Sequence, residues 1–194
     1  MPSRCTIPLV RCFVAVELPD HVLRPLQALL AAAPRGPDVR WCTPDQLHVT
    51  LKFLGEVEDD RLPRVQQTVA DAAQQVAPFV LRLNALGAFP SPRSPRVLWC
   101  GMDDPAGGCA RWVSIADPLF ESLGFEREQR AFTPHVTLAR SRSPRGARLL
   151  RGALERLKPP EPIEMPVTHM TLFESRLSPH GAQYTPVHRA PLGD

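Results

Sequence analysis

The four-residue phrase His-Val-Thr-Leu occurs twice in this chain of 194 residues, at positions 48–51 and 135–138. Apolar and polar side chains alternate around both copies, and this period of two is typical of a half-buried β-strand. Residues two apart on a strand share a face. The pattern therefore predicts two strands, one in each half of the chain. Each presents a histidine and a threonine on one face and apolar side chains on the other.

Further strands and helices are predicted in alternation around these two segments. Strands are expected over residues 12–18, 39–42, 47–53, 79–89, 96–101, 133–139, 163–173 and 183–188. Helices are expected over residues 20–33, 61–77, 109–123 and 148–157. Because strands with one polar face suit antiparallel sheets, we expect an α+β fold rather than a doubly wound parallel sheet.

Composition excludes several classes of protein. Apolar residues make up 43% of the chain, enough for a packed core. No apolar run approaches the roughly 20 residues that span a bilayer, and the first residues lack the pattern of a signal peptide. The net charge of +3 is far from that of a basic structural nucleic-acid binder. We therefore expect a cytoplasmic protein with no membrane partner.

The cysteines and acidic residues give no sign of a metal site. The five cysteines are scattered and form no CxxC pair, which predicts neither a disulfide framework nor a cysteine zinc site. No acidic cluster or HExxH pattern accompanies the repeated histidines. We expect reduced thiols, no metal and no other cofactor.

Two imidazoles and two hydroxyls on facing strands, across a cleft, suit the cleavage of a phosphodiester. One group must deprotonate the nucleophile and another must protonate the leaving oxygen, and histidine, with a pKa of about 6.5, can do either. Hydroxyls can donate to the non-bridging phosphate oxygens. A third His-x-Thr-Leu pattern lies at residues 169–172, so the pattern alone leaves open which two histidines form the site.

The longer context of the two copies resembles a known family. Residues 47–57 (LHVTLKFLGEV) resemble the first signature of the 2H phosphoesterases, and residues 130–140 (RAFTPHVTLAR) resemble the second. The resemblance is narrower still to the RNA 2′,3′-cyclic phosphodiesterases, also called LigT-like 2′-5′ RNA ligases. Three other stretches fit the same family: residues 11–19, 87–99 and 172–184.

This resemblance implies two pseudo-symmetric lobes, each an antiparallel sheet with flanking helices, around a central groove. It runs from about residue 11 to about residue 192, so we expect one bilobal domain over residues 1–194, with residues 1–10 as an N-terminal extension. It leaves His169 outside catalysis, as a strand or surface histidine. Val49 stands where the family commonly has leucine or isoleucine, a change expected to alter only packing.

The implied activity is metal-independent hydrolysis of a 2′,3′-cyclic phosphate, on an RNA end or a nucleotide, to a 2′-phosphate. The resemblance implies His48 as the general acid and His135 as the general base, with Thr50 and Thr137 holding the phosphate. The same site can run the reverse, ATP-independent joining reaction to a 2′-5′ linkage. Mass action of water favours hydrolysis.

Four further residues near these stretches are candidate substrate contacts. Phe53 can stack on the terminal base or pack into the core on the face of Leu51, and both interpretations stay open. Arg130 and Arg140 flank the second signature and can pair with phosphates or lie on a solvated surface. Tyr184 can close the site.

Other functions remain open from the sequence. The same site could act on another nucleotide, such as a 2′-5′ oligoadenylate or ADP-ribose cyclic phosphate. Alternatively, the chain is a non-catalytic module that binds an RNA end, although binding alone needs no pair of titratable imidazoles. The arginines of residues 140–145 are expected to form an exposed loop that attracts RNA non-specifically. With no coiled coil or long apolar stripe visible, we expect a monomer.

Overall fold

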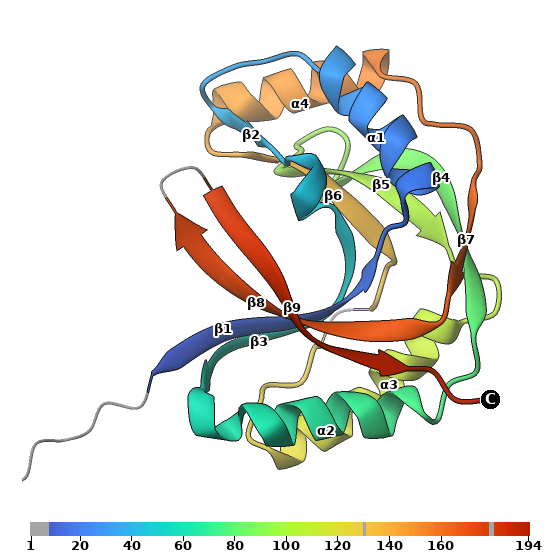
Figure 1. Ribbon diagram of the computed structural model, residues 1–194. Helices are drawn as coiled ribbons and strands as arrows, with labels where there is room; N and C mark the ends of the chain where they lie inside the picture. Colours follow the sequence, from blue (N-terminus) through green and yellow to red (C-terminus); the bar gives the residue numbers. More distant parts are fainter. Residues whose placement is uncertain (1–7, 130, 179–180) are drawn as a thin grey trace, which may run out of the picture.

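The computed structural model describes residues 8–129, 131–178 and 181–194. Within them, nine strands form one antiparallel sheet that is flanked by four α-helices (Figure 1). The strands are β1 (Leu9–Glu17), β2 (Val39–Trp41), β3 (His48–Glu58), β4 (Phe79–Phe89), β5 (Val97–Asp103), β6 (His135–Ser141), β7 (Glu164–Val167), β8 (His169–Ser178) and β9 (Gly181–Pro191). The α-helices are α1 (Asp20–Ala32), α2 (Leu62–Ala73), α3 (Gly108–Ser122) and α4 (Pro144–Arg156), and the short 3-10 helices are η1 (Pro44–Gln46) and η2 (Asp59–Arg61).

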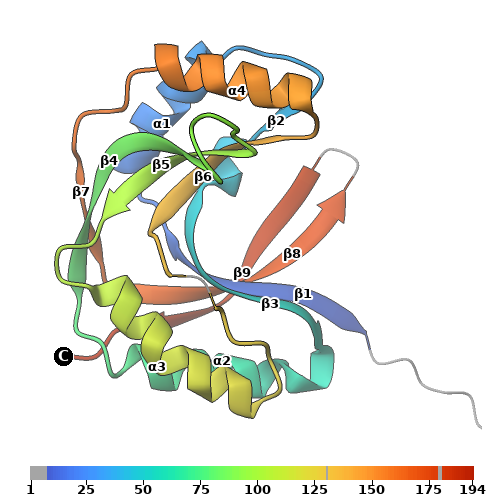
Figure 2. The ribbon, with the colours of Figure 1, turned by 180° about the vertical axis from the view of Figure 1, so that it is seen from behind.

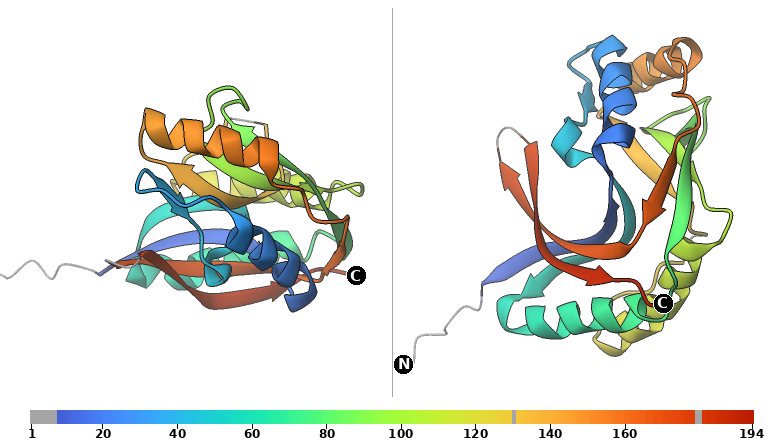
Figure 3. Two further views of the ribbon diagram at one scale, coloured as in Figure 1. Left: turned by 90° about the horizontal axis from the view of Figure 1, so that it is seen from above. Right: turned by 45° about the vertical axis from the view of Figure 1, so that its right-hand side comes forward.

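The strand order divides the sheet into two lobes. The order is β7-β4-β5-β6-β3-β1-β8-β9, and β2 also pairs with β6. One lobe therefore holds β3, β1, β8 and β9, the other holds β6, β5, β4 and β7, and the pairing of β3 with β6 joins them. The sheet is strongly curled, with α1 and α4 at one end and α2 and α3 at the other (Figures 1 and 3). The expected α+β class with two pseudo-symmetric lobes is confirmed.

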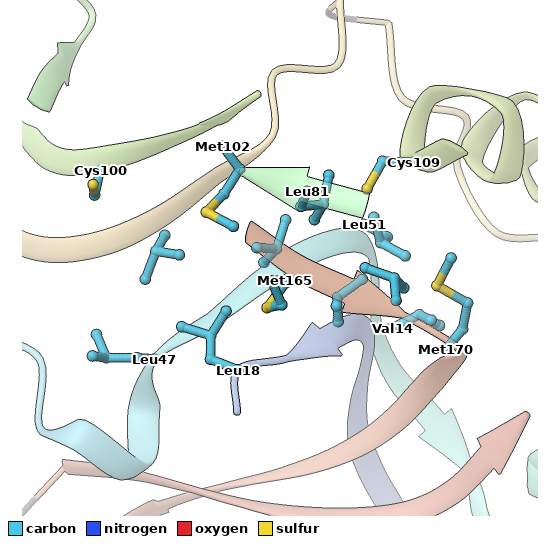
Figure 4. Packing of buried hydrophobic residues seen from close by; sticks show 14 of the residues in the cluster. Val14, Leu18, Leu47, Leu51, Leu81, Cys100, Met102, Cys109, Met165 and Met170 are labelled. Carbon is cyan, nitrogen blue, oxygen red and sulfur yellow. The ribbon is translucent and has the colours of Figure 1, made fainter. Parts of the chain in front are cut away.

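One face of the sheet packs against the helices to form the main core. Val14 of the first lobe and Leu81 and Met165 of the second are fully buried in this core (Figure 4). Trp112 of α3 and Leu150 of α4 belong to the same cluster and have no exposed surface. Alternation of side chains along each strand leaves the opposite face for other groups.

The opposite face carries a smaller apolar cluster of its own. Phe13, Ala15 and Phe173, from the neighbouring strands β1 and β8, are buried there, and Tyr184 of β9 packs against them. The separation of the two clusters shows that the first lobe has an apolar lining on both sides of its sheet. The site described below lies on the face of this smaller cluster.

The segment predicted as one strand over residues 163–173 is two strands. β7 ends at Val167 and pairs with β4, whereas β8 begins at His169 and pairs with β1 and β9. Thr168 is thus the point at which the chain crosses from one lobe to the other. Both segments are extended and alternate in polarity, so the local pattern gives no sign of the crossing.

Helix α4 begins earlier than the predicted start at residue 148. Pro144 occupies its first turn, where its missing N–H costs nothing, and the Ser143 hydroxyl accepts a hydrogen bond from the Gly146 N–H at 3.2 Å. None of the helices within the described residues is long and apolar enough to cross a membrane.

The start of β1 falls within the expected N-terminal extension. Residues 1–7 lie outside the described residues. Leu9 and Val10 already belong to β1, where they pair with Glu58 and Val57 of β3.

Candidate active site

The two repeated segments meet at the junction of the lobes. Val49 of β3 lies directly opposite Val136 of β6 in an antiparallel pair, and both side chains are fully buried on the core face. In this register each histidine lies opposite the threonine of the other strand, on the face away from the core. The four side chains form what we call the His/Thr square: His48, Thr50, His135 and Thr137.

The square is formed by adjacent strands of one sheet. We expected two strands facing each other across a cleft, whereas β3 and β6 are hydrogen-bonded neighbours. Cβ atoms of directly opposite residues on such strands are about 4.5–5.5 Å apart. A single pairing at the centre of the sheet is therefore enough to bring together two histidines that are far apart in the sequence.

Each imidazole is held by the backbone two residues before it. His135 Nδ1 lies 2.7 Å from the Thr133 carbonyl oxygen, and His48 makes the corresponding hydrogen bond to the backbone of Gln46. A ring nitrogen next to a carbonyl oxygen must carry the hydrogen, so Nδ1 of His135 is the donor. In the neutral ring this leaves Nε2 with a free lone pair, which can accept a proton.

Aromatic side chains surround the two histidines differently. The His48 ring lies 4.7 Å from that of Phe13 and 5.2 Å, edge-on, from that of Tyr184. The His135 ring lies 5.0 Å from that of Phe89 and 6.0 Å from that of Trp99. Each histidine is therefore partly shielded from water by its own lobe.

This shielding lowers the pKa of both histidines. Burial, with smaller effects from the charges of Arg140 and His135, lowers the pKa of His48 from 6.5 to about 4. Burial and the charge of Arg140 also lower the pKa of His135. Arg140 thus acts on both imidazoles, and both are neutral at pH 7 in the free protein. A bound anion has the opposite effect, because it stabilises the imidazolium form.

A β-bulge in each strand decides which side chains follow the threonines. Ala15 pairs with Thr50 but Val14 pairs with Lys52, so Leu51 is an extra residue in β3. In the same way, Leu98 of β5 pairs with Ala139 but Trp99 pairs with Thr137, so Leu138 is an extra residue in β6. A bulge shifts the alternation by one position. Phe53 and Arg140, which strict alternation would put on the core face, therefore lie on the face of the square.

Phe53 projects into solvent on this face. Its side chain is 63% exposed, and its ring lies 6.0 Å from that of Phe13, which in turn contacts His48. The alternative interpretation, that Phe53 packs into the core beside Leu51, is wrong. The bulge at Leu51 is the physical reason.

The same bulge places Lys52 on the core face, where its side chain is buried. Its ammonium group donates to Asp117 Oδ1 at 2.5 Å and to the Glu126 carbonyl oxygen at 2.6 Å. Only 5% of Lys52 is exposed. This ion pair ties β3 to α3 and to the segment that leads to β6. Sequence reasoning missed it, because a lysine in an alternating strand is ordinarily placed on the solvent face.

Arginines collect around Arg140 and Tyr184. Arg140 lies opposite Arg40 of β2 in the sheet, and both are exposed. Burial raises the pKa of the Tyr184 hydroxyl, while the charges of Arg140, Arg40 and Arg11 lower it, so all three guanidinium groups lie near this tyrosine. Arg40 and Arg11 were not among the predicted site residues. They reach the site through pairings between strands that are distant in sequence.

Two residues named in the sequence analysis remain, Arg130 and His169. Arg130 lies outside the described residues. His169, in the third copy of the pattern, has its Nε2 3.1 Å from Glu17 Oε2, and Glu17 also accepts hydrogen bonds from Arg189. Since β1 separates β8 from β3, His169 is two strands away from His48. The expected structural role of His169 agrees with these contacts.

The acidic, cysteine and histidine side chains are dispersed around the sheet. Across residues 8–129, 131–178 and 181–194, no group of three or more of them is placed to hold a metal ion. The face therefore carries two neutral imidazoles, two hydroxyls, a cluster of guanidinium groups and one exposed aromatic ring, that of Phe53. This set can bind a phosphate and move protons on two of its sides.

The chain matches one family model twice. The model, described as LigT like Phosphoesterase, matches residues 16–99 and again residues 101–184. The first match contains β3 and the second contains β6. Each match therefore contributes one half of the His/Thr square, while each lobe of the sheet takes strands from both matches: β4 of the second lobe lies in the first match, and β8 of the first lobe lies in the second match.

Similar proteins cover nearly the whole chain. An RNA 2′,3′-cyclic phosphodiesterase of Methanothermobacter thermautotrophicus is 36% identical over 180 residues, which is 91% of this chain and 95% of that protein. An RNA 2′,3′-cyclic phosphodiesterase of Thermus thermophilus is 33% identical, over 94% of this chain and 90% of that protein. The crystal structure of E. coli LigT complexed with 3′-AMP is 27% identical, with a TM-score of 0.76 over 96% of this chain and 100% of that one.

Proposed function

Because the chain belongs to the family of LigT-like phosphoesterases, we propose that it hydrolyses 2′,3′-cyclic phosphates at RNA ends, or on nucleotides, to 2′-phosphates. The observation that carries this proposal is the His/Thr square, which holds two titratable imidazoles and two hydroxyls on one face of the sheet. The names of the relatives and the 3′-AMP in E. coli LigT support the choice of substrate.

In the proposed reaction, water attacks phosphorus while the bond from phosphorus to the 3′ oxygen breaks. His135 acts as the general base and takes a proton from water on Nε2, the nitrogen left free by the hydrogen bond to Thr133. His48 acts as the general acid and gives a proton to the 3′ oxygen. The hydroxyls of Thr50 and Thr137, with the Arg140 guanidinium, stabilise the charge on the non-bridging oxygens.

The low pKa of His48 adds a requirement to this scheme. A general acid must be protonated, yet burial holds the pKa of His48 at about 4 in the free protein. A phosphodiester anion next to the ring offsets the charge of Arg140 and raises that pKa. Substrate binding near neutral pH is therefore coupled to the uptake of a proton, and activity follows a bell-shaped pH profile.

Three finer features belong to the same proposal. Phe53 stacks on the terminal base and Tyr184 closes the other side of the site. Run in reverse, the same groups join a cyclic phosphate end to a 5′-hydroxyl without ATP, as the minor reaction. We also place the enzyme in the cytoplasm and expect a monomer. The monomer is supported by the His/Thr square, all of which comes from one chain.

The test is turnover by protein treated with EDTA. The substrates are 2′,3′-cyclic AMP and a short RNA with a 2′,3′-cyclic phosphate end, and the product isomer is identified by chromatography. We expect the 2′-phosphate from both. A 3′-phosphate product would overturn the direction of attack. If neither substrate is turned over while a 2′-5′ oligoadenylate is cleaved, the substrate class is wrong, and binding without turnover of any of them would leave a non-catalytic module.

A further inference from the structure

A second cluster of positive charge lies outside the His/Thr square. Five arginines line a cavity of about 510 Å³ where β6, α4 and the segment between β4 and β5 meet. Arg93 and Arg96 come from that segment, Arg142 from the turn between β6 and α4, and Arg148 and Arg151 from α4. Figure 2 shows the segment between β4 and β5 lying beside α4 and β6.

The charges in this cavity are not compensated by the protein. None of its ten lining residues is acidic. Among the described residues, no partner takes a hydrogen bond or ion pair from any of the five guanidinium groups. Four described arginines elsewhere are paired with glutamates: Arg82, Arg127, Arg176 and Arg189. Arg148 and Arg151 lie three residues apart on α4, close enough to repel each other unless an anion lies between them.

The turn that carries Arg142 is fixed by its neighbours. The Ser141 hydroxyl donates to the Ser143 carbonyl oxygen at 2.7 Å, and the Arg142 N–H donates to the Asp38 carbonyl oxygen at 2.8 Å. Ser143 itself caps α4. Hydrogen bonds thus hold this part of the cavity wall in place.

The cavity lies at the end of the strand that begins with His135. Ser141, one residue beyond Arg140, is part of the cavity wall, and its N–H donates to the Arg96 carbonyl oxygen at 2.8 Å. Ser141 lies six residue steps beyond His135 on the strand, which is at most about 20 Å at the usual rise per residue. A single cyclic nucleotide at the square cannot reach so far, whereas an RNA strand can.

We propose that this cavity, which we call the arginine cavity, binds backbone phosphates of the RNA strand whose cyclic end occupies the His/Thr square. The proposal rests on the proposed function. Guanidinium groups match phosphate oxygens in pairs and stay charged at every physiological pH. Five of them exceed what one phosphate needs, so the cavity suits a polyanion.

No aromatic side chain lines the arginine cavity. Bases are ordinarily read by stacking or by hydrogen bonds to their edges, whereas contacts to phosphates carry no sequence information. The arginine cavity therefore favours longer RNA over mononucleotides without selecting a sequence. Specificity for the cyclic end stays with the square.

The experiment compares two substrates in the double variant Arg148→Gln/Arg151→Gln. The first is 2′,3′-cyclic AMP, and the second is an RNA of about twelve nucleotides with a 2′,3′-cyclic phosphate end, long enough to span 20 Å. For the RNA we expect KM to rise about tenfold, and the slope of log KM against log salt to fall by about 0.7 for each phosphate that the protein no longer neutralises. For the mononucleotide, kcat and KM stay within about twofold.

The matched control removes the same charge elsewhere. Arg64 of α2 and Arg111 of α3 are exposed on the other side of the molecule, so Arg64→Gln/Arg111→Gln tests the effect of net charge alone. If this control raises the RNA KM as much as the cavity variant does, or if the cavity variant leaves it unchanged, the arginine cavity is not an RNA site.

A binding measurement separates this inference from the proposed function. The probe is a fluorescent RNA of the same length that ends in a 3′-hydroxyl, and its anisotropy is followed during titration with wild type and both double variants. Weaker binding by the cavity variant alone supports the arginine cavity even if the wild type turns over neither substrate. Equal binding by all three proteins overturns it even if turnover is normal.

Discussion

The two lobes contribute the same framework to the site and different side chains at its ends. In both, a histidine and a threonine are followed by a bulged leucine, and two residues further on a side chain returns to the face of the square. That side chain is Phe53 in the first lobe and Arg140 in the second. The duplicated framework places His48 and His135 symmetrically, and the side chains around them differ between the lobes. One lobe offers an exposed ring and the other a guanidinium group.

The largest expected effect on activity comes from removing either histidine, the feature that the two lobes share. His48→Ala and His135→Ala should each lower kcat by about 10²–10⁴, because each removes one of the two proton transfers. The double variant should be little worse than either single variant, since the two groups act as a unit. Steady-state kinetics with 2′,3′-cyclic AMP measures this.

His169→Ala is the matched control, because it removes the third histidine of the same sequence pattern. It should keep kcat within about twofold of wild type. A reduction like that of the other two variants would show that the choice of the catalytic pair is wrong.

The next effect concerns the buried residues that follow the bulges, Lys52 in the first lobe and Ala139 in the second. Lys52→Met leaves Asp117 buried without its partner and should lower the free energy of unfolding by about 3–5 kcal/mol. Replacing both members, as Lys52→Met/Asp117→Leu, should recover most of that stability. Urea unfolding followed by fluorescence measures both changes.

Lys158, the other lysine of the chain, is exposed, so Lys158→Met should change the free energy of unfolding by no more than about 0.5 kcal/mol. If Lys52→Met is as mild as this control, the ion pair contributes little. The link between β3 and α3 must then depend on apolar packing.

The bulges also mark where sequence reasoning stops. Alternation is a local property, so it predicted β3, β6 and the two His/Thr pairs. An extra apolar residue such as Leu51 or Leu138 leaves a strand as apolar as before, so the sequence does not reveal the bulge. It therefore could not predict that Lys52 faces the core and Phe53 faces the square. Pairing between distant strands is hidden for a different reason. Arg40 reaches Arg140 only through the pairing of β2 with β6.

A smaller effect on activity is expected at Phe53 and Arg140, the equivalent positions at which the two lobes differ. Arg140→Gln should lower kcat/KM for 2′,3′-cyclic AMP by about 10-fold to 100-fold, because it removes a charged hydrogen-bond donor to the phosphate. Phe53→Ala should mainly raise KM, by about tenfold, because it removes the ring that stacks on the base. Phe53→Leu keeps an apolar side chain but no ring and serves as the matched variant.

NMR titration adds an independent measurement for Arg140→Gln. Removing the guanidinium charge should raise the pKa of both His48 and His135, whose values that charge now lowers. If Phe53→Ala changed kcat and left KM unchanged, the proposed role of Phe53 in binding the base would be wrong.

The smallest expected effect distinguishes the two histidines by their burial. His48 has a pKa of about 4 in the folded chain against about 6.5 when unfolded. The unfolded state therefore takes up the proton more readily, and the stability that is present above pH 6.5 is lost as the pH falls towards 4. His48→Asn should remove part of this dependence on pH, and His135→Asn a smaller part, since the pKa of His135 is lowered less. Thermal unfolding of the three proteins between pH 7 and about pH 4 measures the difference. Equal slopes for the two variants would mean that the lobes shield their histidines alike, and the asymmetry of the square would then lie only in Phe53 and Arg140.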